Sequence, residues 1–357
     1  MDYMSSNNNK INDKEFNIYA GEKPKILLLG NGLNRISGQC SWDGLLDAIK
    51  DNEMFSASAK DYSIPMSLKA PMLCKGAVNN RIKDYISREF NNVYTCSSKK
   101  VLEILSDYVN VPFDYILTTN YSYEIEMAMQ CKVKLRESAI KRMTKHTSEV
   151  TRAEGKYLLS TYNTPDRDGK RQVWHIHGEY RKPSGMIIGQ YYYGNLIYKY
   201  KELLDKRVKS FIKNIKYEKP ESITSWLDAF MLGDLYIVGL GLDFAETDLW
   251  WLLEKKMLYS EKILTGKTIY YSPKVVHNKN SKCFDCSCDK ECYVCNRFDD
   301  NKFTGTSFCH NKMLEIYGVE SRNLNFIINS DGNGNGSYED FYRKVLNDIK
   351  QDIINTR

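Results

Sequence analysis

The chain contains three short apolar runs, each followed at once by a loop with glycine or asparagine, and this feature constrains its fold most. Runs of this length without polar interruption are typical of strands that are buried on both faces of a sheet. Amphipathic helical patterns separate them, so the sequence predicts an α/β fold with a mostly parallel sheet and helices on both faces. The runs are Lys25–Leu29, Phe113–Thr119 and Leu235–Val238, and their loops begin at Gly30, Asn120 and Gly239.

Further patterns complete this alternation of strands and helices. Two more strands are expected at Lys267–Tyr271 and Leu324–Ile328. A hairpin is expected where Lys156–Tyr162 and Arg171–Ile176 flank a turn rich in Pro, Asp and Gly. The predicted helices are Trp42–Lys50, Lys99–Val109, a segment that begins near Tyr123, Thr247–Tyr259 and Tyr338–Ile354.

Domain organisation is expected to be simple. We expect a flexible leader at 1–24 and a single domain at 25–357. Within this domain, 195–231 would form a small helical cap and 277–311 a Cys-rich insertion. No segment indicates a second domain that senses a signal, so we expect activation through a homo-oligomer or through a separate partner protein.

Charge and hydropathy restrict the classes of function. The 357 residues are 27% charged and carry a net charge of +6, which permits binding of anionic small molecules. This charge does not favour direct binding of nucleic acid. No apolar run is long enough to cross a bilayer, and the polar N-terminal segment lacks a signal-peptide pattern. We therefore expect a cytoplasmic protein that has no contact with a membrane.

Three strand ends carry candidate ligand-binding residues, because open α/β sheets bind ligands at the carboxyl ends of their strands. Glycines at 30 and 32 would let backbone N–H groups approach a phosphate, although Arg35 replaces the third glycine of the dinucleotide-binding fingerprint. Asn120 offers a donor and an acceptor for a ribose hydroxyl or a water. The alternative interpretations are an ordinary strand-to-helix turn for the first loop and a helix N-cap for Asn120. Gly239, Gly241 and Asp243 could admit a nucleoside or could form a tight turn with an N-cap.

The run Trp174-His175-Ile176-His177-Gly178 places two of the five histidines of the chain two residues apart. On a strand, positions i and i+2 point to the same face, so His175 and His177 are expected to project together. Histidine exchanges protons near neutral pH, which suits catalysis. A hydrogen-bonded pair in the core is the alternative.

A cysteine cluster late in the chain is a second candidate site. The ten Cys of the chain are expected to be free thiols or metal ligands in a reducing compartment. Two CxxC pairs have the spacing of zinc knuckles, and thiolates select Zn²⁺. The alternative is a loop of free thiols. The four ligands expected for a structural zinc are Cys283, Cys286, Cys292 and Cys295, with Cys288, Cys309 and His310 as substitutes.

Together, the strand-end motifs resemble the sirtuin-like domains of bacterial anti-phage NADases. The resemblance covers about Lys25 to Asn329 and implies a Rossmann-like fold that binds NAD⁺ as its substrate. It implies that Asn120 and His177 are the catalytic pair and that His175 supports the loop. It also implies that Gly30, Asn31, Gly32, Asn34 and Thr119 bind the phosphates and ribose, with Gly239, Gly241 and Asp243 on the adenosine side. The motifs are Gly30–Asn34, Ser41–Leu46, Thr118–Tyr121, His175–Gly178 and Gly239–Asp243.

The resemblance implies an NAD⁺ glycohydrolase that releases nicotinamide and depletes NAD⁺ in abortive infection. Ser122 stands where the family usually has Asp, which weakens a contact to the nicotinamide amide. The partner expected for the enzyme is a defence ATPase or a phage trigger. The alternative function is a non-catalytic subunit that senses NAD⁺ or ADP-ribose and signals to a partner ATPase or nuclease. Deacylation of protein lysines is disfavoured because no Cys follows Gly178 before the next motif.

Overall fold

The computed structural model describes the greater part of the chain. The predicted helix Trp42–Lys50, the predicted ligand Asp243 and the four predicted zinc ligands lie outside the described residues. The described residues are 15–37, 67–68, 83–85, 87–88, 99–130, 151–153, 161–163, 172–180, 182–242, 244, 246–277, 305–328 and 335–355.

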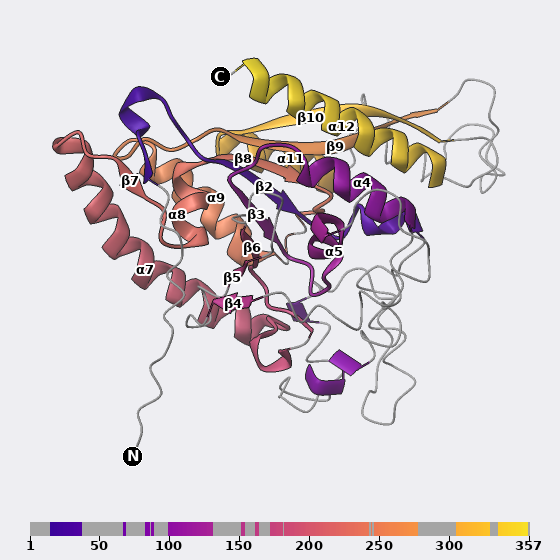
Figure 1. Ribbon diagram of the computed structural model, residues 1–357, viewed down its shortest axis with the longest axis horizontal. Coiled ribbons are helices and arrows are strands. Elements are labelled where there is room, and N and C mark those ends of the chain that lie inside the picture. The colour runs from indigo at the N-terminus through magenta and orange to yellow at the C-terminus, as the bar shows by residue number, and fades with distance from the viewer. Residues whose placement is uncertain are drawn as a thin grey trace.

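An eight-stranded sheet forms the centre of the molecule (Figure 1), in the order β10-β9-β8-β2-β3-β6-β5-β4. The six strands from β10 to β6 are parallel to their neighbours, whereas β5 and β4 are antiparallel. This arrangement confirms the predicted mostly parallel α/β sheet. The strands are β2 (Lys25–Leu29), β3 (Tyr115–Thr118), β4 (Thr151–Ala153), β5 (Thr161–Asn163), β6 (Gln172–His175), β8 (Asp234–Val238), β9 (Thr268–His277) and β10 (Val319–Ile328).

The strand order has one topological switch point, between β2 and β8. The chain passes from β2 to β3 and β6 in one direction and then returns to β8 on the other side of β2. It continues outward from β8 to β9 and β10. This order is Rossmann-like, and ligands in such sheets bind where the direction reverses, at the carboxyl ends of the strands.

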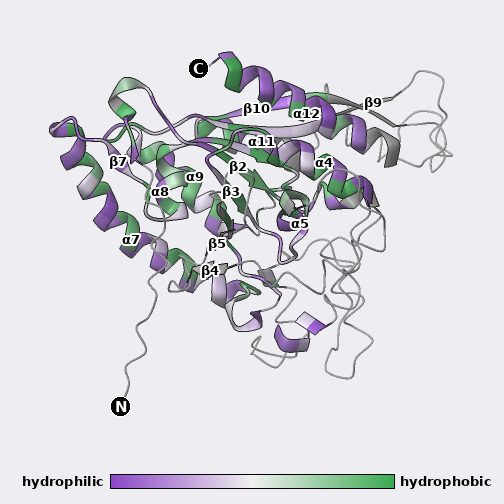
Figure 2. Ribbon diagram, viewed as in Figure 1, coloured by the Kyte–Doolittle hydropathy of each residue, from purple (hydrophilic) through white to green (hydrophobic). Residues whose placement is uncertain are grey.

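Helices cover both faces of the sheet. In β2, Leu27 and Leu29 belong to the core cluster under α4, α5 and α12, whereas Ile26 and Leu28 belong to the cluster under α7, α8 and α9. Figure 2 shows the apolar strands enclosed between these layers. Fully burying one such side chain contributes roughly 1.5–3 kcal/mol. The helices are α4 (Lys99–Val109), α5 (Glu124–Gln130), α7 (Gln190–Lys216), α8 (Trp226–Leu232), α9 (Thr247–Tyr259), α11 (Gly305–Ile316) and α12 (Asn335–Asn355).

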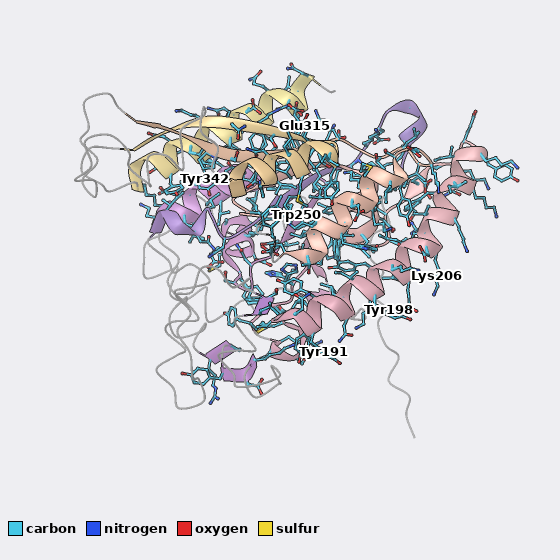
Figure 3. The ribbon with its side chains drawn as sticks, turned by 180° about the vertical axis from the view of Figure 1, so that it is seen from behind. Tyr191, Tyr198, Lys206, Trp250, Glu315 and Tyr342 are labelled. Carbon is cyan, nitrogen blue, oxygen red and sulfur yellow. The ribbon has the colours of Figure 1, made fainter. Side chains whose placement is uncertain are left out.

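Residues 195–231, expected as a helical cap, lie in α7, β7 (Glu221–Ser222) and α8. The inner face of α7, which includes Leu204 and Phe211, belongs to the same core cluster as strand residues. Its outer face carries Tyr191, Tyr198 and Lys206 (Figure 3). The 3.6-residue period of α7 therefore places this long helix directly on the sheet.

The helices α4 and α9 have the predicted bounds, whereas β9 and β10 are longer than predicted. They pair with each other over ten residues, from Val319 opposite Thr268 to Ile328 opposite His277. The first half of β10 is mostly polar, with four polar residues after Val319, because an edge strand has less apolar cover than a central one. The predicted hairpin is present as β5 and β6, with Tyr162 opposite Val173.

The described part of the predicted leader is folded. Phe16 in β1 (Glu15–Phe16) is buried and pairs with Glu221 of β7, and a 3₁₀ turn, η1 (Ile18–Ala20), follows. The structure therefore differs from the expected flexible leader over 15–24, because Phe16 and Ile18 join the core. Among the described helices, none combines the length and the apolar character that a bilayer crossing requires.

Candidate active site

The loops that follow β2, β3 and β8 meet at one edge of the sheet, beside the switch point. The amide N–H of Gly32 donates to the carbonyl oxygen of Gly239 at 2.6 Å, and that of Gly30 donates to Val238 at 3.0 Å. On the other side, the amide of Thr119 donates to Leu29 at 3.3 Å. The structure thus brings together the predicted site residues of three separate segments.

Close packing between these loops explains the glycines at 30 and 32. A Cβ atom on Gly30 would lie 2.5 Å from the carbonyl oxygen of Gly239, and one on Gly32 would lie 2.7 Å from the same atom. Gly239 itself has a φ of 64°, in the left-handed region that favours glycine. The amides of Gly30 and Gly32 already donate to the carbonyl oxygens of Val238 and Gly239, so their role at a phosphate stays a prediction.

Asn31 and Asn34 lie together in the turn after β2. The side-chain Nδ2 of Asn34 donates to Oδ1 of Asn31 at 3.1 Å, and Asn34 is buried. Gly241 lies in the loop after β8, where a Cβ atom would meet no atom within 4 Å. The loop after β2 is therefore closely packed. The loop after β8 has open space at one of its predicted ligand-binding positions, Gly241.

Asn120 carries the clearest mark of a ligand site. Its Nδ2 donates to the carbonyl oxygen of Gly30 at 3.4 Å, and its amide donates to Oγ1 of Thr118 at 3.1 Å. Its Oδ1 atom is buried and has no hydrogen-bond partner among the described residues. An unsatisfied buried acceptor costs about 1–3 kcal/mol, so this position suits a donor from a ligand or a water. Because α5 begins only at Glu124, Asn120 is not its N-cap.

His175 links Asn120 to a buried carboxylate. Its Nδ1 donates to the main-chain oxygen of Asn120 at 2.7 Å, and its Nε2 donates to Oε1 of Glu126 at 2.6 Å. Burial alone would lower the pKa of this imidazole, but the charge and hydrogen bond of Glu126 outweigh burial and raise the pKa. Both ring nitrogens therefore carry protons, and the ring holds Asn120 in place.

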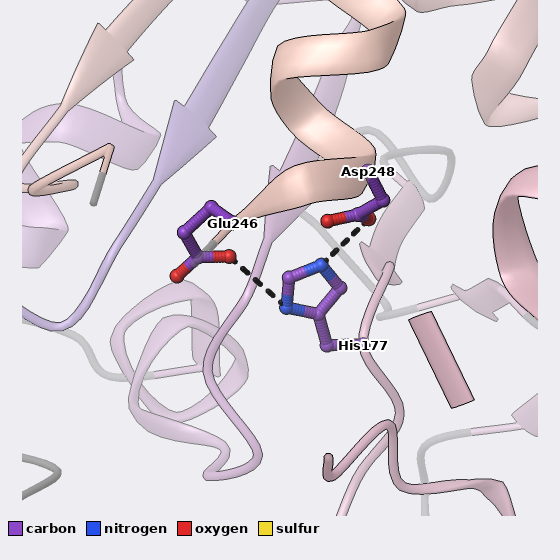
Figure 4. A group of neighbouring side chains, drawn as sticks. All are labelled: His177, Glu246 and Asp248. Atoms are coloured by element: carbon purple, nitrogen blue, oxygen red, sulfur yellow. Dashed lines mark hydrogen bonds and ion pairs between the residues drawn. The ribbon is translucent and has the colours of Figure 1, made fainter. Parts of the chain in front are cut away.

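His177 lies between two carboxylates from the N-terminus of α9. Its Nε2 donates to Oδ2 of Asp248 at 2.9 Å, and Oε2 of Glu246 lies 3.8 Å from its Nδ1 (Figure 4). Burial alone would lower the pKa of His177; the charge and hydrogen bond of Asp248 and the charge of Glu246 raise it to about 9. His177 is therefore an imidazolium at neutral pH.

The prediction that the two imidazoles project together is wrong. The strand β6 ends at His175, and the chain turns at Ile176 and His177. His175 consequently contacts α5, whereas His177 contacts α9, and these helices cover opposite faces of the sheet. The i, i+2 rule holds only while the chain stays extended.

The chain around His177 is fixed by backbone contacts. Gly178 has a φ of 89°, and a Cβ atom on it would lie 2.3 Å from the carbonyl oxygen of Gly185. The amide of Ile187 donates to the carbonyl oxygen of His177 at 2.8 Å, and the hydroxyl of Tyr121 donates to Ile187 at 2.7 Å. Glycine after the second histidine is thus required by the tight turn.

The group His177, Glu246 and Asp248 has donor atoms within 4.8 Å of one another, a spacing that could also hold a cation. Because each ring nitrogen of His177 faces a carboxylate, the arrangement is that of an ion-paired cluster. His310, a substitute ligand in the predicted zinc site, instead lies 3.1 Å through Nε2 from the carbonyl oxygen of Leu242. A carbonyl oxygen can only accept, so this nitrogen carries a proton and does not bind metal.

The sequence prediction missed Glu126, Glu246 and Asp248 as partners of the histidines. A signal for the last two was present: they flank the first residue of the helix predicted at Thr247–Tyr259, just after a strand-end loop. Acidic residues favour the N-terminal turn of a helix, and this helix begins at the edge where ligands bind. Glu126 had no comparable signal, because it lies inside a short helix.

Residues 114–216 match a family model described as a SIR2-like domain. This segment runs from β3 to the end of α7 and contains Asn120 and His177. No curated protein matches the chain. SIR2-like domains are in general NAD-dependent enzymes, and the matched segment holds both predicted catalytic residues.

Proposed function

We propose that this chain is an NAD⁺ glycohydrolase, which cleaves NAD⁺ to nicotinamide and ADP-ribose. The main support is the position of Asn120: a buried carboxamide oxygen without a hydrogen-bond partner among the described residues, beside the switch point of a Rossmann-like sheet. The match of residues 114–216 to a SIR2-like domain supports NAD⁺ as the ligand class. Gly239 and Gly241 would lie on the adenosine side, with Asp243 beside them.

The residues suit cleavage of the N-glycosidic bond between ribose and nicotinamide. Nicotinamide in NAD⁺ already carries a positive charge, so it leaves as a neutral molecule without a strong general acid. The reaction then requires an oriented substrate, an attacking water and groups that tolerate positive charge on the ribose. Oδ1 of Asn120 would accept a hydrogen bond from the water or a ribose hydroxyl, which orients the attack.

His177 would act beside Asn120. A neutral imidazole could accept a proton, as the sequence suggested, but the pKa of about 9 makes this form scarce in the substrate-free protein at neutral pH. As an imidazolium, His177 donates hydrogen bonds, and one acceptor in reach of a bound substrate is a ribose hydroxyl. Its ion pairing with Asp248 keeps the local positive charge compensated.

We also propose the biological setting that the motif resemblance suggests. The enzyme would deplete NAD⁺ during phage infection in the cytoplasm, as the effector of an abortive-infection system. Uncontrolled NAD⁺ cleavage would kill the host cell, so activity would depend on a homo-oligomer or on a partner such as a defence ATPase or a phage trigger. The Cys-rich segment remains a proposed structural zinc site.

The decisive experiment is NAD⁺ turnover by the full chain. Nicotinamide release would be followed over a wide range of protein concentrations, and NAD⁺ would be measured in cells that express the chain. Asn120→Ala and His177→Ala should each lower turnover by roughly 100-fold or more. Gly194→Ala, on the exposed face of α7, is the control and should retain activity.

Each outcome distinguishes the alternatives. If calorimetry shows NAD⁺ binding but neither the purified protein nor the expressing cells show turnover, the sensing subunit would be favoured over the enzyme. Equal turnover by wild type and by both alanine variants would show that this site does not perform the reaction. Absence of both turnover and binding would overturn the proposed function.

A further inference from the structure

The ion-paired cluster raises the question of which group accepts the proton from the attacking water. Both ring nitrogens of His177 face carboxylates, and the ring is a cation at neutral pH. An imidazolium has no lone pair with which to accept a proton. The acceptor at neutral pH must therefore come from another group in the same place.

The two carboxylates differ in their access to a substrate. The side chain of Asp248 is fully buried, and its Oδ2 accepts hydrogen bonds from His177 at 2.9 Å and from the hydroxyl of Tyr200 at 3.3 Å. The side chain of Glu246 is 18% exposed, against 4% for that of His177. Figure 4 shows the two carboxylates at the two nitrogens of the ring. Glu246 is therefore the most accessible of the three side chains, although its Oε2 atom, which faces His177, is itself buried.

The distances also separate their roles. The contact between His177 and Asp248 is a hydrogen bond, whereas 3.8 Å between Nδ1 and Oε2 of Glu246 is an ion pair that is too long for one. Asp248 thus fixes the ring through a hydrogen bond, whereas Glu246 interacts with the ring by charge alone. Glu246 is the N-cap residue of α9, and Asp248 lies in its first turn.

The charge of the cluster suits the reaction. One imidazolium and two carboxylates leave one net negative charge, and Glu246 is the more exposed of the two carboxylates. Cleavage of the bond to nicotinamide develops positive charge on the ribose. A carboxylate near that carbon stabilises this charge, whereas an imidazolium alone would oppose it.

We propose that Glu246 is a further catalytic residue, which accepts the proton of the attacking water while Asp248 positions His177 as a hydrogen-bond donor. This inference rests on the proposed function. The water oxygen forms a bond to C1′ of the ribose, and the bond from C1′ to the nicotinamide nitrogen breaks. Its electron pair leaves with neutral nicotinamide, and the proton of the water passes to the Glu246 carboxylate. Hydrolysis needs no oxidant or further reactant.

The groups packed around His177 are consistent with this assignment. From α7, Tyr193 lies edge-on to the ring at 5.5 Å between centroids, and Tyr200 donates to Asp248. Burial raises the pKa of both phenols well above its usual range, so they stay neutral. From α9, the groups that face the ring are the two carboxylates. Among these described neighbours, Glu246 is the more exposed of the two carboxylates that can accept a proton.

The variant Glu246→Gln distinguishes Glu246 from His177 as the acceptor, because the two assignments predict changes of opposite sign. Removing the negative charge lowers the pKa of His177 and increases its neutral fraction at pH 7. If His177 accepts the proton, kcat/KM at pH 7 rises. If Glu246 accepts it, kcat/KM falls by about 100-fold or more. The matched control is Glu254→Gln, a partly exposed carboxylate further along the same helix.

Two measurements accompany the kinetics. NMR titration of histidine-labelled protein, which has only five His, should show a lower pKa for His177 in Glu246→Gln than in wild type. Added formate should restore part of the turnover of Glu246→Ala and should not change that of Glu254→Ala. A purely structural role for Glu246 would give no such rescue.

The outcomes separate this inference from the proposed function. Wild-type turnover with unchanged or raised kcat/KM in Glu246→Gln would overturn the role of Glu246 and leave the glycohydrolase intact. Wild type that never cleaves NAD⁺ would overturn both. Loss of turnover together with formate rescue would support both.

Discussion

Nδ1 of His175 donates to the main-chain oxygen of Asn120 at 2.7 Å, and the same ring is ion-paired to Glu126. The exposed fractions of the His175 and Glu126 side chains are only 2% and 0%. The orientation of the predicted catalytic carboxamide thus depends on a buried ion pair on the opposite side of the sheet from α9.

Glu126→Leu should therefore impair both stability and turnover. Removing one partner of a buried ion pair costs about 3–5 kcal/mol of unfolding free energy. The displaced Asn120 should lower kcat more than it changes KM. Urea unfolding and steady-state kinetics would measure these effects. Glu126→Gln removes the charge but keeps a hydrogen-bond acceptor at the same place, so it should lose less than Glu126→Leu. Equal losses in the two variants would contradict a contribution from the hydrogen bond to His175.

Close approach between the loop after β2 and the loop after β8 leads to a second prediction. Gly30→Ala should destabilise the fold by about 1–3 kcal/mol or more, because its Cβ atom would meet the oxygen of Gly239 at 2.5 Å. Turnover should also fall, since Asn120 donates to the carbonyl of Gly30. Gly241→Ala has open space and should stay within about 0.5 kcal/mol of wild type. Thermal unfolding of both variants is the measurement, and equal midpoints would refute the packing argument.

The sequence was sufficient to predict the sheet and the strand ends. Short apolar runs such as Leu27 to Leu29 and Leu235 to Val238, separated by helical patterns, favour a central parallel sheet, and glycine or asparagine marks where each run ends. Because parallel strands bring their carboxyl ends to one edge, Gly30, Asn120 and Gly239 were expected at the same edge of the sheet. The order of the strands in the sheet depended on contacts that no local pattern encodes.

The protonation states of the two histidines could not be predicted from the sequence. Glu126 lies 49 positions from His175, and Asp248 lies 71 positions from His177. Such pairs form only when the helices pack on the finished sheet. A local pattern could therefore suggest a pKa near the ordinary value for His177, whereas the folded protein holds that pKa at about 9.

Lys256 leads to a prediction about stability at alkaline pH. It is buried, its Nζ donates to the carbonyl oxygen of Gly233 at 2.8 Å, and burial lowers its pKa to about 7. From pH 7 upward the unfolded chain binds the proton that the folded chain has lost, so this group raises stability as pH increases. The difference in unfolding free energy between wild type and Lys256→Met should therefore shift in favour of wild type between pH 7 and 10. A pH-independent difference would show that Lys256 is not buried in its neutral form.

His177 should show the opposite dependence on pH. Its folded pKa of about 9 lies above its ordinary value of 6.5, so its proton stabilises the fold fully below pH 6.5. This contribution is lost as pH rises through 9, and one pKa unit corresponds to about 1.4 kcal/mol, so the loss is on the order of 3 kcal/mol. Asp248→Asn removes the hydrogen-bonded charge that raises the pKa and should flatten this decline.

Urea unfolding of wild type and Asp248→Asn at a series of pH values isolates this contribution. Lys256 and the other titrating groups are present in both proteins, so they cancel in the difference between the two curves. The advantage of wild type over Asp248→Asn should be largest near pH 6 and should shrink toward pH 9. Parallel curves would mean that His177 is not held as an imidazolium, and the argument for Glu246 as the proton acceptor would lose its basis.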